Sequence, residues 1–313
     1  MTQPKQLAII VPAYNEEPII EMTAQHLIAL LENLIKEKLI RDDSYACFVD
    51  DGSRDKTWAL TEKLAAQSKY IKGIKLARNF GHQFAVLTGL CETQADIYVS
   101  IDADLQDDEN AIRDMVIKNR EGFEVVYGVR AKRDTDSFFK RVTALGFYKL
   151  MSIMGVRTVY NHADFRLLSK QAVDILKQFP ETNLFLRGLV PLIGLPSASV
   201  FYDRKARVAG ESKYPLRKML SFAWEGITSF SVKPLKIATV MGFLLCLAGF
   251  IFLLYSVWTY YHGYTVPGWT SLIVSIYFLG GVQLFCIGII GEYVGKIYKE
   301  VKGRPRFIVE KKV

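Results

Sequence analysis

The sequence of 313 residues is poor in cysteine and histidine, with four of each. Cys47 and Cys91 are isolated, Cys246 and Cys286 lie within apolar runs, and no CxxC spacing is present. This usage argues against a structural disulfide or a zinc site and agrees with a reducing compartment. Half of the residues are hydrophobic, a composition that excludes the disordered, collagen-like and low-complexity classes of protein.

Charge is missing altogether from residues 237–291, which contain no Asp, Glu, Lys or Arg. Turn-forming residues at 262–268 divide this run into 237–261 and 269–290. Each part reaches the ~20 residues that a bilayer-spanning helix needs, so the sequence predicts two transmembrane helices. The alternative is a pair of buried core helices in a soluble protein, but such helices seldom run so far without a polar face. Aromatic residues cluster near the connecting loop, as they do at headgroup height: Tyr255, Trp258, Tyr260, Tyr261, Tyr264 and Trp269.

Basic residues flank the apolar run on its outer sides and are absent from the loop within it. Lys233 and Lys236 precede the first span, and five basic residues follow the second one between 296 and 306. The positive-inside rule then predicts that both ends of the chain are cytoplasmic. Residues 1–5 lead directly into a strand-like run, without the pattern of a signal peptide. We therefore expect a multi-pass protein of the cell (inner) membrane with a cytoplasmic N-terminal domain.

The formal net charge of +8 is unevenly distributed along the chain. Residues 1–199 hold 25 basic and 26 acidic side chains, a balance of −1, whereas residues 200–313 hold 15 and 6, a balance of +9. A basic excess can indicate nucleic acid, a membrane surface or a phosphorylated ligand. Because the excess lies beside the apolar run, we expect lipid phosphate and membrane as partners, and no nucleic acid.

Short β-branched runs alternate with helical stretches over the first 200 residues. We predict strands at 7–11, 45–49, 73–76 and 97–101, and helices at 19–36, 56–66 and 82–91. This alternation is typical of the α/β class, with a mostly parallel sheet that carries helices on both faces and binds ligands beyond the carboxyl ends of its strands. Polar residues follow each predicted strand, in the segments PAYNEE, DDGS, RNFGH and DADLQD.

The last of these segments contains Asp102 and Asp104, two carboxylates at the end of a predicted strand. An isolated pair of this kind is common in solvated turns. Here other carboxylates are expected at the same sheet edge, where they would repel one another without a cation. Oxygen ligands at this spacing suit Mg²⁺ or Mn²⁺, with the remaining ligands supplied by water and a diphosphate.

Taken in order, seven motifs resemble those of the family 2 glycosyltransferases with a GT-A fold. They are IIVPAYNEE, FVDDGSRD, LARNFGHQFAVLTGL, SIDADLQD, YGVR, ADFRLLSK and RVAGESKY. With two spans behind them, they resemble more narrowly the polyprenyl-phosphate hexosyltransferases of the bacterial prophage-glucosylation type, relatives of dolichol-phosphate mannose synthase. The QxxRW motif of processive polysaccharide synthases is absent.

The resemblance implies a domain order: a GT-A domain at 1–214, an amphipathic interfacial helix at 215–232, a pair of transmembrane helices within 233–292 and a basic cytoplasmic tail at 293–313. Glycines at 280, 281, 288 and 291 would allow close helix packing. We therefore expect a homo-oligomer, and the resemblance implies a tetramer.

By resemblance, one group of residues holds the nucleotide sugar and another holds the metal. Asp104, Arg130 and Asp164 are the residues expected to take part in catalysis, with Arg130 facing the departing diphosphate and Asp164 acting as a base or an orienting group. The metal ligands would be Asp102, Asp104 and Gln106. The nucleotide-sugar group comprises Pro12, Tyr14, Glu16, Val49, Asp51, Arg78, Asp102, Ala103 and Arg130.

Simpler roles stay open for several of these residues. Pro12 and Tyr14 could merely shape a turn, and Asp50 and Asp51 could cap the following helix. Arg130 could be a surface residue at a strand end, and Arg78 could brace its loop. Asp164 could form an ion pair with Arg166, and His82 is interpreted as a structural or supporting group because it opens an apolar helix.

For the acceptor, the resemblance assigns Arg207, Ser212 and Lys213 to the phosphate of a polyprenyl lipid. Apolar residues recur at helical spacing over 215–230, which predicts an amphipathic helix at the membrane surface. The alternative is that these basic residues are general anchors for anionic lipid.

Together these features predict an inverting transfer of a hexose from a UDP-sugar to undecaprenyl phosphate, because a phosphate dianion needs no strong base to attack the anomeric carbon. Glucose is the first expectation, and N-acetylglucosamine, mannose or an aminosugar are alternatives. A processive synthase would need more spans and the missing motif. A non-enzymatic flippase or anchor would not need the carboxylate pair, and two spans without buried charge are a poor transport path.

Overall fold

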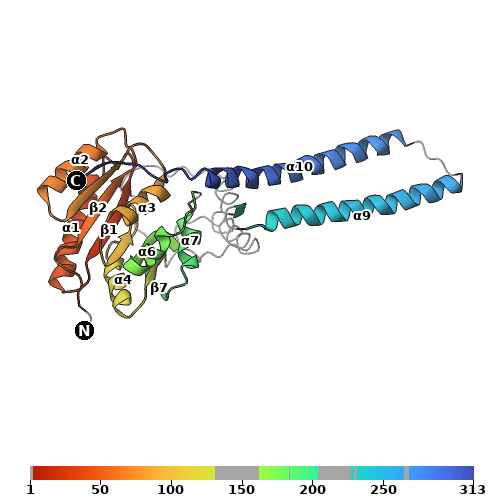
Figure 1. Cartoon of the computed structure of the whole chain (residues 1–313). Coiled ribbons are helices and arrows are strands. Elements are labelled where there is room, and N and C mark those ends of the chain that lie inside the picture. The colour runs from red at the N-terminus through yellow and green to blue at the C-terminus, as the bar shows by residue number, and fades with distance from the viewer. Residues whose placement is uncertain (1–2, 131–161, 183, 204–226, 229–230, 264–267) are drawn as a thin grey trace. The chain divides into compact units, whose positions relative to one another are not determined.

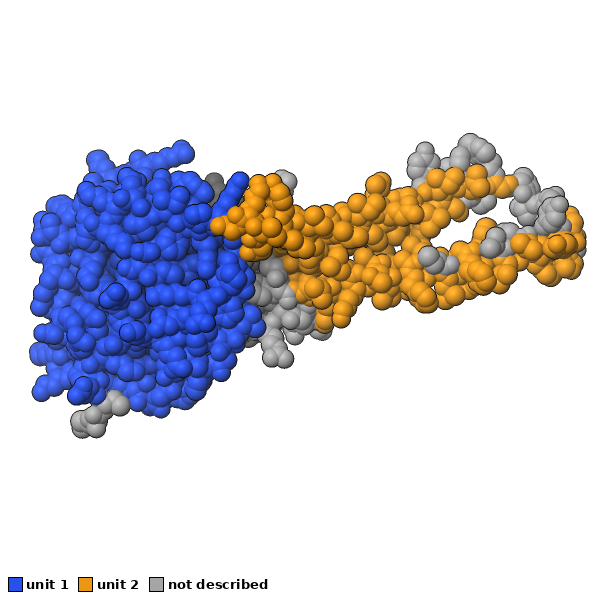
Figure 2. Space-filling model, viewed as in Figure 1, with its two compact units in different colours: residues 1–148, 157–215, 304–313 blue, residues 149–156, 216–303 orange. Residues whose placement is uncertain are grey.

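The computed structural model describes residues 3–130, 162–182, 184–203, 227–228, 231–263 and 268–313. The chain divides into two compact units, shown in blue and orange in Figure 2. Unit 1 comprises residues 1–148, 157–215 and 304–313, and unit 2 comprises residues 149–156 and 216–303. Arg207, Ser212 and Lys213, and most of the interfacial helix expected at 215–232, lie outside the described residues.

Unit 1 is built on one eight-stranded sheet with the order β7-β5-β6-β4-β1-β2-β3-β8 (Figure 1). Neighbouring strands from β4 to β3 are parallel, as are β5 and β7, whereas β6 and β8 run antiparallel to their neighbours. The predicted α/β class with a mostly parallel sheet is confirmed. The strands are β1 (Leu7–Ala13), β2 (Tyr45–Asp50), β3 (Ile71–Leu76), β4 (Ile97–Ser100), β5 (Val125–Arg130), β6 (His162–Ser169), β7 (Ser197–Tyr202) and β8 (Val309–Lys312).

Helices cover both faces of this sheet because its central strands are apolar on both sides. In β1, Ile9 belongs to a buried cluster with residues of α1 and α4. Ile10 points the other way, toward α3, where a Cβ at Gly89 would lie only 2.2 Å from Ile10 Cγ2. Fully buried, parallel strands of this kind read as continuous hydrophobic runs. The helices of unit 1 are α1 (Ile20–Lys36), α2 (Thr57–Gln67), α3 (His82–Glu92), α4 (Ala111–Arg120), α6 (Lys170–Lys177) and α7 (Leu186–Leu192).

Unit 2 contains two long helices, α9 (Lys233–Tyr261) and α10 (Trp269–Val301). Both are long and apolar enough to cross a bilayer, by length and composition. Phe250, Ile251 and Phe252 are consecutive and therefore point in three directions from α9, yet each is about 60% exposed, at 58, 60 and 62%. Apolar exposure on every side is what a helix surrounded by lipid requires. The predicted spans at 237–261 and 269–290 fall within these two helices.

The residues expected to form a basic tail are ordered along most of their length. Residues up to Val301 continue α10, and Val309–Lys312 form β8, which pairs with β3 of unit 1. The last strand of the chain therefore completes one edge of the sheet that begins near the N-terminus.

Candidate functional site

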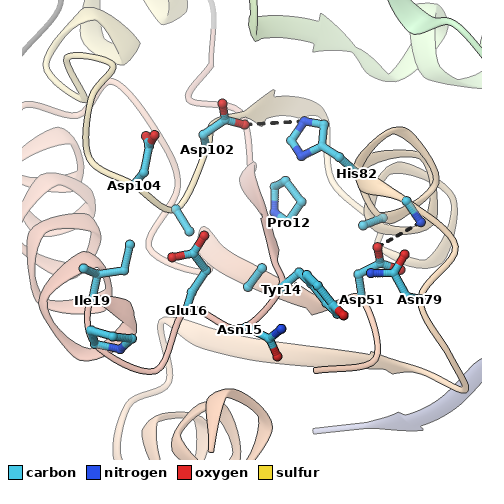
Figure 3. Close-up of a pocket in the computed structure, with 15 residues that line it drawn as sticks. Pro12, Tyr14, Asn15, Glu16, Ile19, Asp51, Asn79, His82, Asp102 and Asp104 are labelled. Atoms are coloured by element: carbon cyan, nitrogen blue, oxygen red, sulfur yellow. Dashed lines mark hydrogen bonds and ion pairs between the residues drawn. The ribbon is translucent and has the colours of Figure 1, made fainter. Parts of the chain in front are cut away.

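A cleft of about 510 Å³ lies at the carboxyl ends of β1, β2 and β4 (Figure 3). Parallel strands deliver their following loops to the same sheet edge, so residues distant in sequence meet there. Seven of the predicted site residues line the cleft: Pro12, Tyr14, Glu16, Asp51, Asp102, Ala103 and Asp104. The other described lining residues are Ala13, Asn15, Pro18, Ile19, Asn79, Gly81, His82 and Ala85.

The loop after β1 is fixed against the loop after β2 by hydrogen bonds. The backbone N–H of Asn15 donates to Ser53 Oγ at 2.9 Å, and Asn15 Oδ1 accepts from the backbone N–H of Arg54 at 2.9 Å. The backbone N–H of Glu16 donates to Thr57 Oγ1, also at 2.9 Å. Tyr14, between β1 and these anchored residues, is 41% exposed, so its ring is available at the cleft. The loop is held in place before any ligand binds.

Asp51 fixes a second wall of the cleft. Its two carboxylate oxygens accept the backbone N–H groups of Phe80 at 2.7 Å and Gly81 at 2.9 Å. Burial raises the pKa of Asp51, although these two hydrogen bonds lower it. Gly52 has a φ of +68°, and a Cβ there would lie 2.5 Å from the carbonyl carbon of Arg78. Only glycine permits so close an approach between the two loops.

Asp50 does not duplicate this role. It accepts the backbone N–H of Ser53 at 3.3 Å, within the turn that precedes α2. Asp50 therefore closes this turn but does not cap α2, whose N-cap position, Lys56, has no side-chain cap hydrogen bond. Asp51 bonds to the loop after β3 instead.

Asp102 and Asp104 both project into the cleft (Figure 3). Partial burial raises the pKa of Asp102 to about 6. His82 opposes this shift, and the carboxylates of Asp164, Asp107 and Asp104 reinforce it. The loop between them is anchored by Thr23 Oγ1, which donates to the carbonyl of Ala103 at 2.8 Å. Crowded carboxylates of this kind are stabilised by a cation.

The donor set of this pair fits a hard divalent cation that keeps several waters. Among the described residues, no three or more His, Cys, Asp or Glu side chains lie together as a group that could hold a metal ion. Gln106, the third predicted ligand, is 7% exposed and is not among the residues lining the cleft. The two aspartates are therefore the candidates in this cleft for holding a divalent cation.

Asp164 lies next to this pair at the centre of a charged network. It accepts Arg166 Nη2 at 2.6 Å and, through both oxygens, Arg187 Nε at 3.1 Å and Nη2 at 3.0 Å. Burial alone would raise the pKa of Asp164, but Arg187 and Arg166 outweigh it and hold the pKa well below its usual range. The ion pair with Arg166 is thus present. A carboxylate held this way is a weak proton acceptor and is better suited to orienting its neighbours.

His82 links the network to the carboxylate pair. Its Nε2 lies 3.5 Å from Asp102 Oδ1 and 3.8 Å from Asp164 Oδ2, and its side chain is 42% exposed at the cleft. The same helix, α3, supplies Gln83, whose Oε1 accepts the backbone N–H of Leu186 at the start of α7 at 3.1 Å. His82 is therefore a wall of the cleft as well as a supporting group.

Arg130, at the end of β5, is held by a buried acid and a tyrosine. Its Nη2 donates to Asp107 Oδ1 at 3.2 Å, and Tyr202 donates its hydroxyl to the same oxygen at 2.6 Å. The Asp107 side chain is 2% exposed and that of Arg130 is 28% exposed. The guanidinium is therefore fixed in place but still reaches solvent.

Several predicted residues do not line the cleft. Val49 is fully buried in β2, and Arg78 stacks its guanidinium 3.9 Å from the centre of the Phe80 ring. Arg130 and Asp164 lie in the ion-paired clusters described above. Arg187, Asn15 and Asn79 are site residues that sequence reasoning missed. An arginine within the apolar segment LFLRGLV was the only available signal for Arg187.

Comparison with known families gives two matches that together cover most of the chain. A model described as "Glycosyl transferase family 2" matches residues 8–176, and one described as "GtrB C-terminal hairpin" matches residues 233–297. The first match contains most of the cleft, and the second contains most of α9 and α10.

Curated relatives match the chain over nearly its full length, among them two from Bacillus subtilis and Shigella flexneri. The uncharacterized glycosyltransferase YkoT of Bacillus subtilis (strain 168) is 53% identical over 306 residues, which cover 97% of this chain and 91% of the relative. The SfII prophage-derived bactoprenol glucosyl transferase of Shigella flexneri is 38% identical over 314 residues, 98% of each chain. Among solved structures, one match is the mannosyltransferase PcManGT from Pyrobaculum calidifontis in complex with GDP-Man and Mn²⁺. It is 17% identical, with a TM-score of 0.48, and the match covers 97% of this chain and 89% of the PcManGT chain.

Proposed function

Since the chain belongs to glycosyl transferase family 2, we propose that it moves a hexose, glucose first, from a UDP-sugar to undecaprenyl phosphate or a similar polyprenyl phosphate. The observation that carries this proposal is the match to a bactoprenol glucosyl transferase over 98% of both chains. This match includes both the cleft and the apolar hairpin. The cleft suits a soluble donor, and the apolar hairpin suits a lipid acceptor.

In the proposed reaction, the cleft binds the nucleotide sugar. The exposed ring of Tyr14 and the wall fixed by Asp51 form a slot for the nucleoside. Asp102 and Asp104 would hold Mg²⁺ or Mn²⁺, which when bound neutralises charge on the diphosphate. Arg130 is the candidate to face the departing diphosphate, because a fixed guanidinium offers several donors to phosphate oxygens.

The acceptor requires little help from a general base. A phosphate monoester has its second pKa near 6 and is largely a dianion at neutral pH. The arginines that hold Asp164 in its charged form support a role in positioning rather than in taking a proton. As the acceptor oxygen bonds to the anomeric carbon, the bond from that carbon to the diphosphate breaks, so direct displacement inverts the anomeric configuration. An α-linked donor then gives a β-linked lipid phosphate sugar.

We further propose that α9 and α10 cross the cell membrane as a hairpin with both chain ends cytoplasmic. The pairing of β8 with β3 supports this, because it places the segment after α10 in the same sheet as the N-terminal strands. A homo-oligomer, with a tetramer as first expectation, would cover part of the exposed apolar surface of these helices. A Cβ at Gly280, Gly281, Gly288 or Gly291 would meet no atom within 4 Å in a single chain, which leaves room for a partner helix.

The experiment is transfer of radiolabelled sugar to polyprenyl phosphate by the full-length protein in detergent or proteoliposomes. A panel of UDP- and GDP-sugars would identify the donor. If the donor sugar is N-acetylglucosamine, mannose or an aminosugar instead of glucose, the proposed reaction stays the same. EDTA is expected to abolish transfer and added Mg²⁺ or Mn²⁺ to restore it. NMR coupling constants of the product would test inversion, which a retained configuration would contradict.

Asp104→Asn is the informative variant and Asp114→Asn its matched control. Asp114 lies on α4 with its side chain 63% exposed and is not among the residues that line the cleft. We expect transfer to fall at least ~100-fold in the first variant and to remain in the second, as for loss of a group that acts on developing charge. Equal labelling of lipid by both variants would rule out the metal role of Asp104.

A further inference from the structure

The C-terminal strand β8 is attached to β3 along its whole length and beyond. Gly73 and Val313 exchange two backbone hydrogen bonds, each of 2.9 Å, at one end of the pair. At the other end, the backbone N–H of Ala77 donates to the carbonyl of Ile308 at 3.0 Å. These contacts lie on either side of the paired residues of β8, so residues 308–313 lie along β3.

Side chains add a second set of contacts between β8 and the rest of unit 1. Lys75 pairs with Glu310 at 2.9 Å, Lys311 with Glu62 of α2 at 2.5 Å and Lys312 with Glu92 of α3 at 2.6 Å. These pairs are partly solvent-exposed, and pairs of this kind contribute little each. The backbone ladder is therefore the main attachment, and the ion pairs select the register.

The end of β3 depends on β8 because β2 no longer reaches it. Pairing between β2 and β3 runs as far as Asp50 opposite Lys75. Beyond Lys75, Leu76 pairs with Val309, after a register shift, and Ala77 bonds to Ile308. The partners of this last part of the strand are thus on the C-terminal segment.

The loop that follows Ala77 forms a wall of the cleft. Asn79 and Gly81 line the cleft, and the N–H groups of Phe80 and Gly81 bond to Asp51. The position of these two amides is set on one side by Asp51 and on the other by the direction in which β3 ends. A shift at Ala77 would move both.

We propose that β8 is a positioning element of the donor site: by pairing with Leu76 and Ala77 it holds the 78–81 loop where Asp51 can bind it. The link to the donor rests on the proposed function, whereas the link to the loop does not. The residues that follow the apolar hairpin thus reach back to shape the cleft.

Two adjacent lysines provide a matched pair of variants. In an antiparallel pair, hydrogen-bonded and non-hydrogen-bonded positions alternate. Because Gly73 and Val313 are hydrogen-bonded, Lys311 opposite Lys75 is hydrogen-bonded too, and Lys312 points its N–H away from β3. Lys311→Pro removes a ladder donor, whereas Lys312→Pro removes an N–H that faces outward on an edge strand. Each variant loses one ion pair.

The first readout is hydrogen–deuterium exchange at the amides of Phe80 and Gly81 in the full-length protein. We expect exchange there to accelerate roughly tenfold or more in Lys311→Pro and to stay near wild type in Lys312→Pro, with the amides of β1 and β4 unchanged in both. The second readout is sugar transfer, where KM for the donor should rise in Lys311→Pro more than kcat falls.

Unchanged exchange at residues 80–81 in Lys311→Pro, or equal acceleration in both variants, would overturn the proposal. If Lys311→Pro also loosens β1 and β4, a chain ending at Phe307 replaces it, and a peptide of residues 304–313 added in trans should restore slow exchange at 80–81. Failure of the peptide to do so while the core stays protected counts against the proposal. Hydrogen–deuterium exchange needs no substrate. A wild-type protein that transfers no sugar would therefore refute the proposed function but leave the exchange result at residues 80–81 unaffected.

Discussion

Replacing Asp164 by alanine is expected to destabilise unit 1 strongly, because the substitution leaves a buried charge without its partner. The Arg166 side chain is 2% exposed, and its Nη2 bonds to Asp164 at 2.6 Å. Its Nη1 donates to the carbonyl of Leu186 at 3.2 Å, and its Nε is buried without a hydrogen-bond partner, so the variant leaves a second part of the guanidinium unpaired. Breaking a buried ion pair by removing one member costs about 3–5 kcal/mol. Arg187→Ala is the control: its side chain is 31% exposed and Asp164 keeps Arg166, so we expect a loss of ~1 kcal/mol.

Cys47 provides the assay within the intact protein. It lies in β2 and is 1% exposed, and burial raises the pKa of its thiol to about 12, so the folded protein should resist alkylation. With Cys91, Cys246 and Cys286 replaced, the rate of Cys47 labelling across a urea series reports the free energy of opening of unit 1 alone. The variants are compared in the same detergent.

The two roles considered for Asp164 give different results in this assay. A positioning role predicts that Asp164→Ala loses stability and transfer together, and that Asp164→Leu combined with Arg166→Met recovers at least half of the lost stability. If Asp164→Ala opens within ~1 kcal/mol of wild type yet loses transfer, the ion-pair reasoning is refuted and the base role gains support.

Two further substitutions test the loops around the cleft. Gly52→Ala adds a Cβ 2.5 Å from the carbonyl carbon of Arg78 and should destabilise the protein by at least ~1–2 kcal/mol and weaken nucleotide binding. Gly194→Ala is the control: its φ of +72° is similar, but its Cβ would meet only the Leu192 carbonyl oxygen at 4.0 Å, so it should show the backbone strain alone. Equal nucleotide affinity in the two variants would contradict the close packing of the loops. Tyr202→Phe removes the 2.6 Å hydrogen bond to buried Asp107 and should cost about 1.5–3 kcal/mol in the Cys47 assay, and no measurable change would show that the bond is replaced by water.

Much of unit 1 was predictable because its central strands carry local signals. The runs at 7–11 and 45–49 are uninterrupted and apolar, and they became β1 and β2 with only one or two residues added. Asp102 and Asp104 were predictable for the same reason, since a polar segment at the end of an apolar strand marks the ligand-binding edge.

Other features depend on contacts that no local pattern encodes. β8 has four residues, three of them charged, and becomes a strand only because β3 offers it an edge. Arg187 reads as part of an apolar segment until folding places it beside Asp164. Val49 and Arg78 show the opposite case: each adjoins a motif of the cleft, but Val49 points into the core and Arg78 stacks on Phe80. Sequence position identified the loops, and tertiary packing decided which side chains enter the cleft.

The pairing of β8 also has a consequence for the solubility of the protein. Without it, β3 would be the edge of the sheet, and its apolar residues Ile71, Ile74 and Leu76 would flank a row of unpaired backbone groups. Exposed apolar edges of that kind recruit strands from other molecules. β8 replaces that edge with one that displays Glu310, Lys311 and Lys312, charges that discourage strand addition. Loss of β8 would therefore expose an apolar edge and favour aggregation of the protein through its sheet.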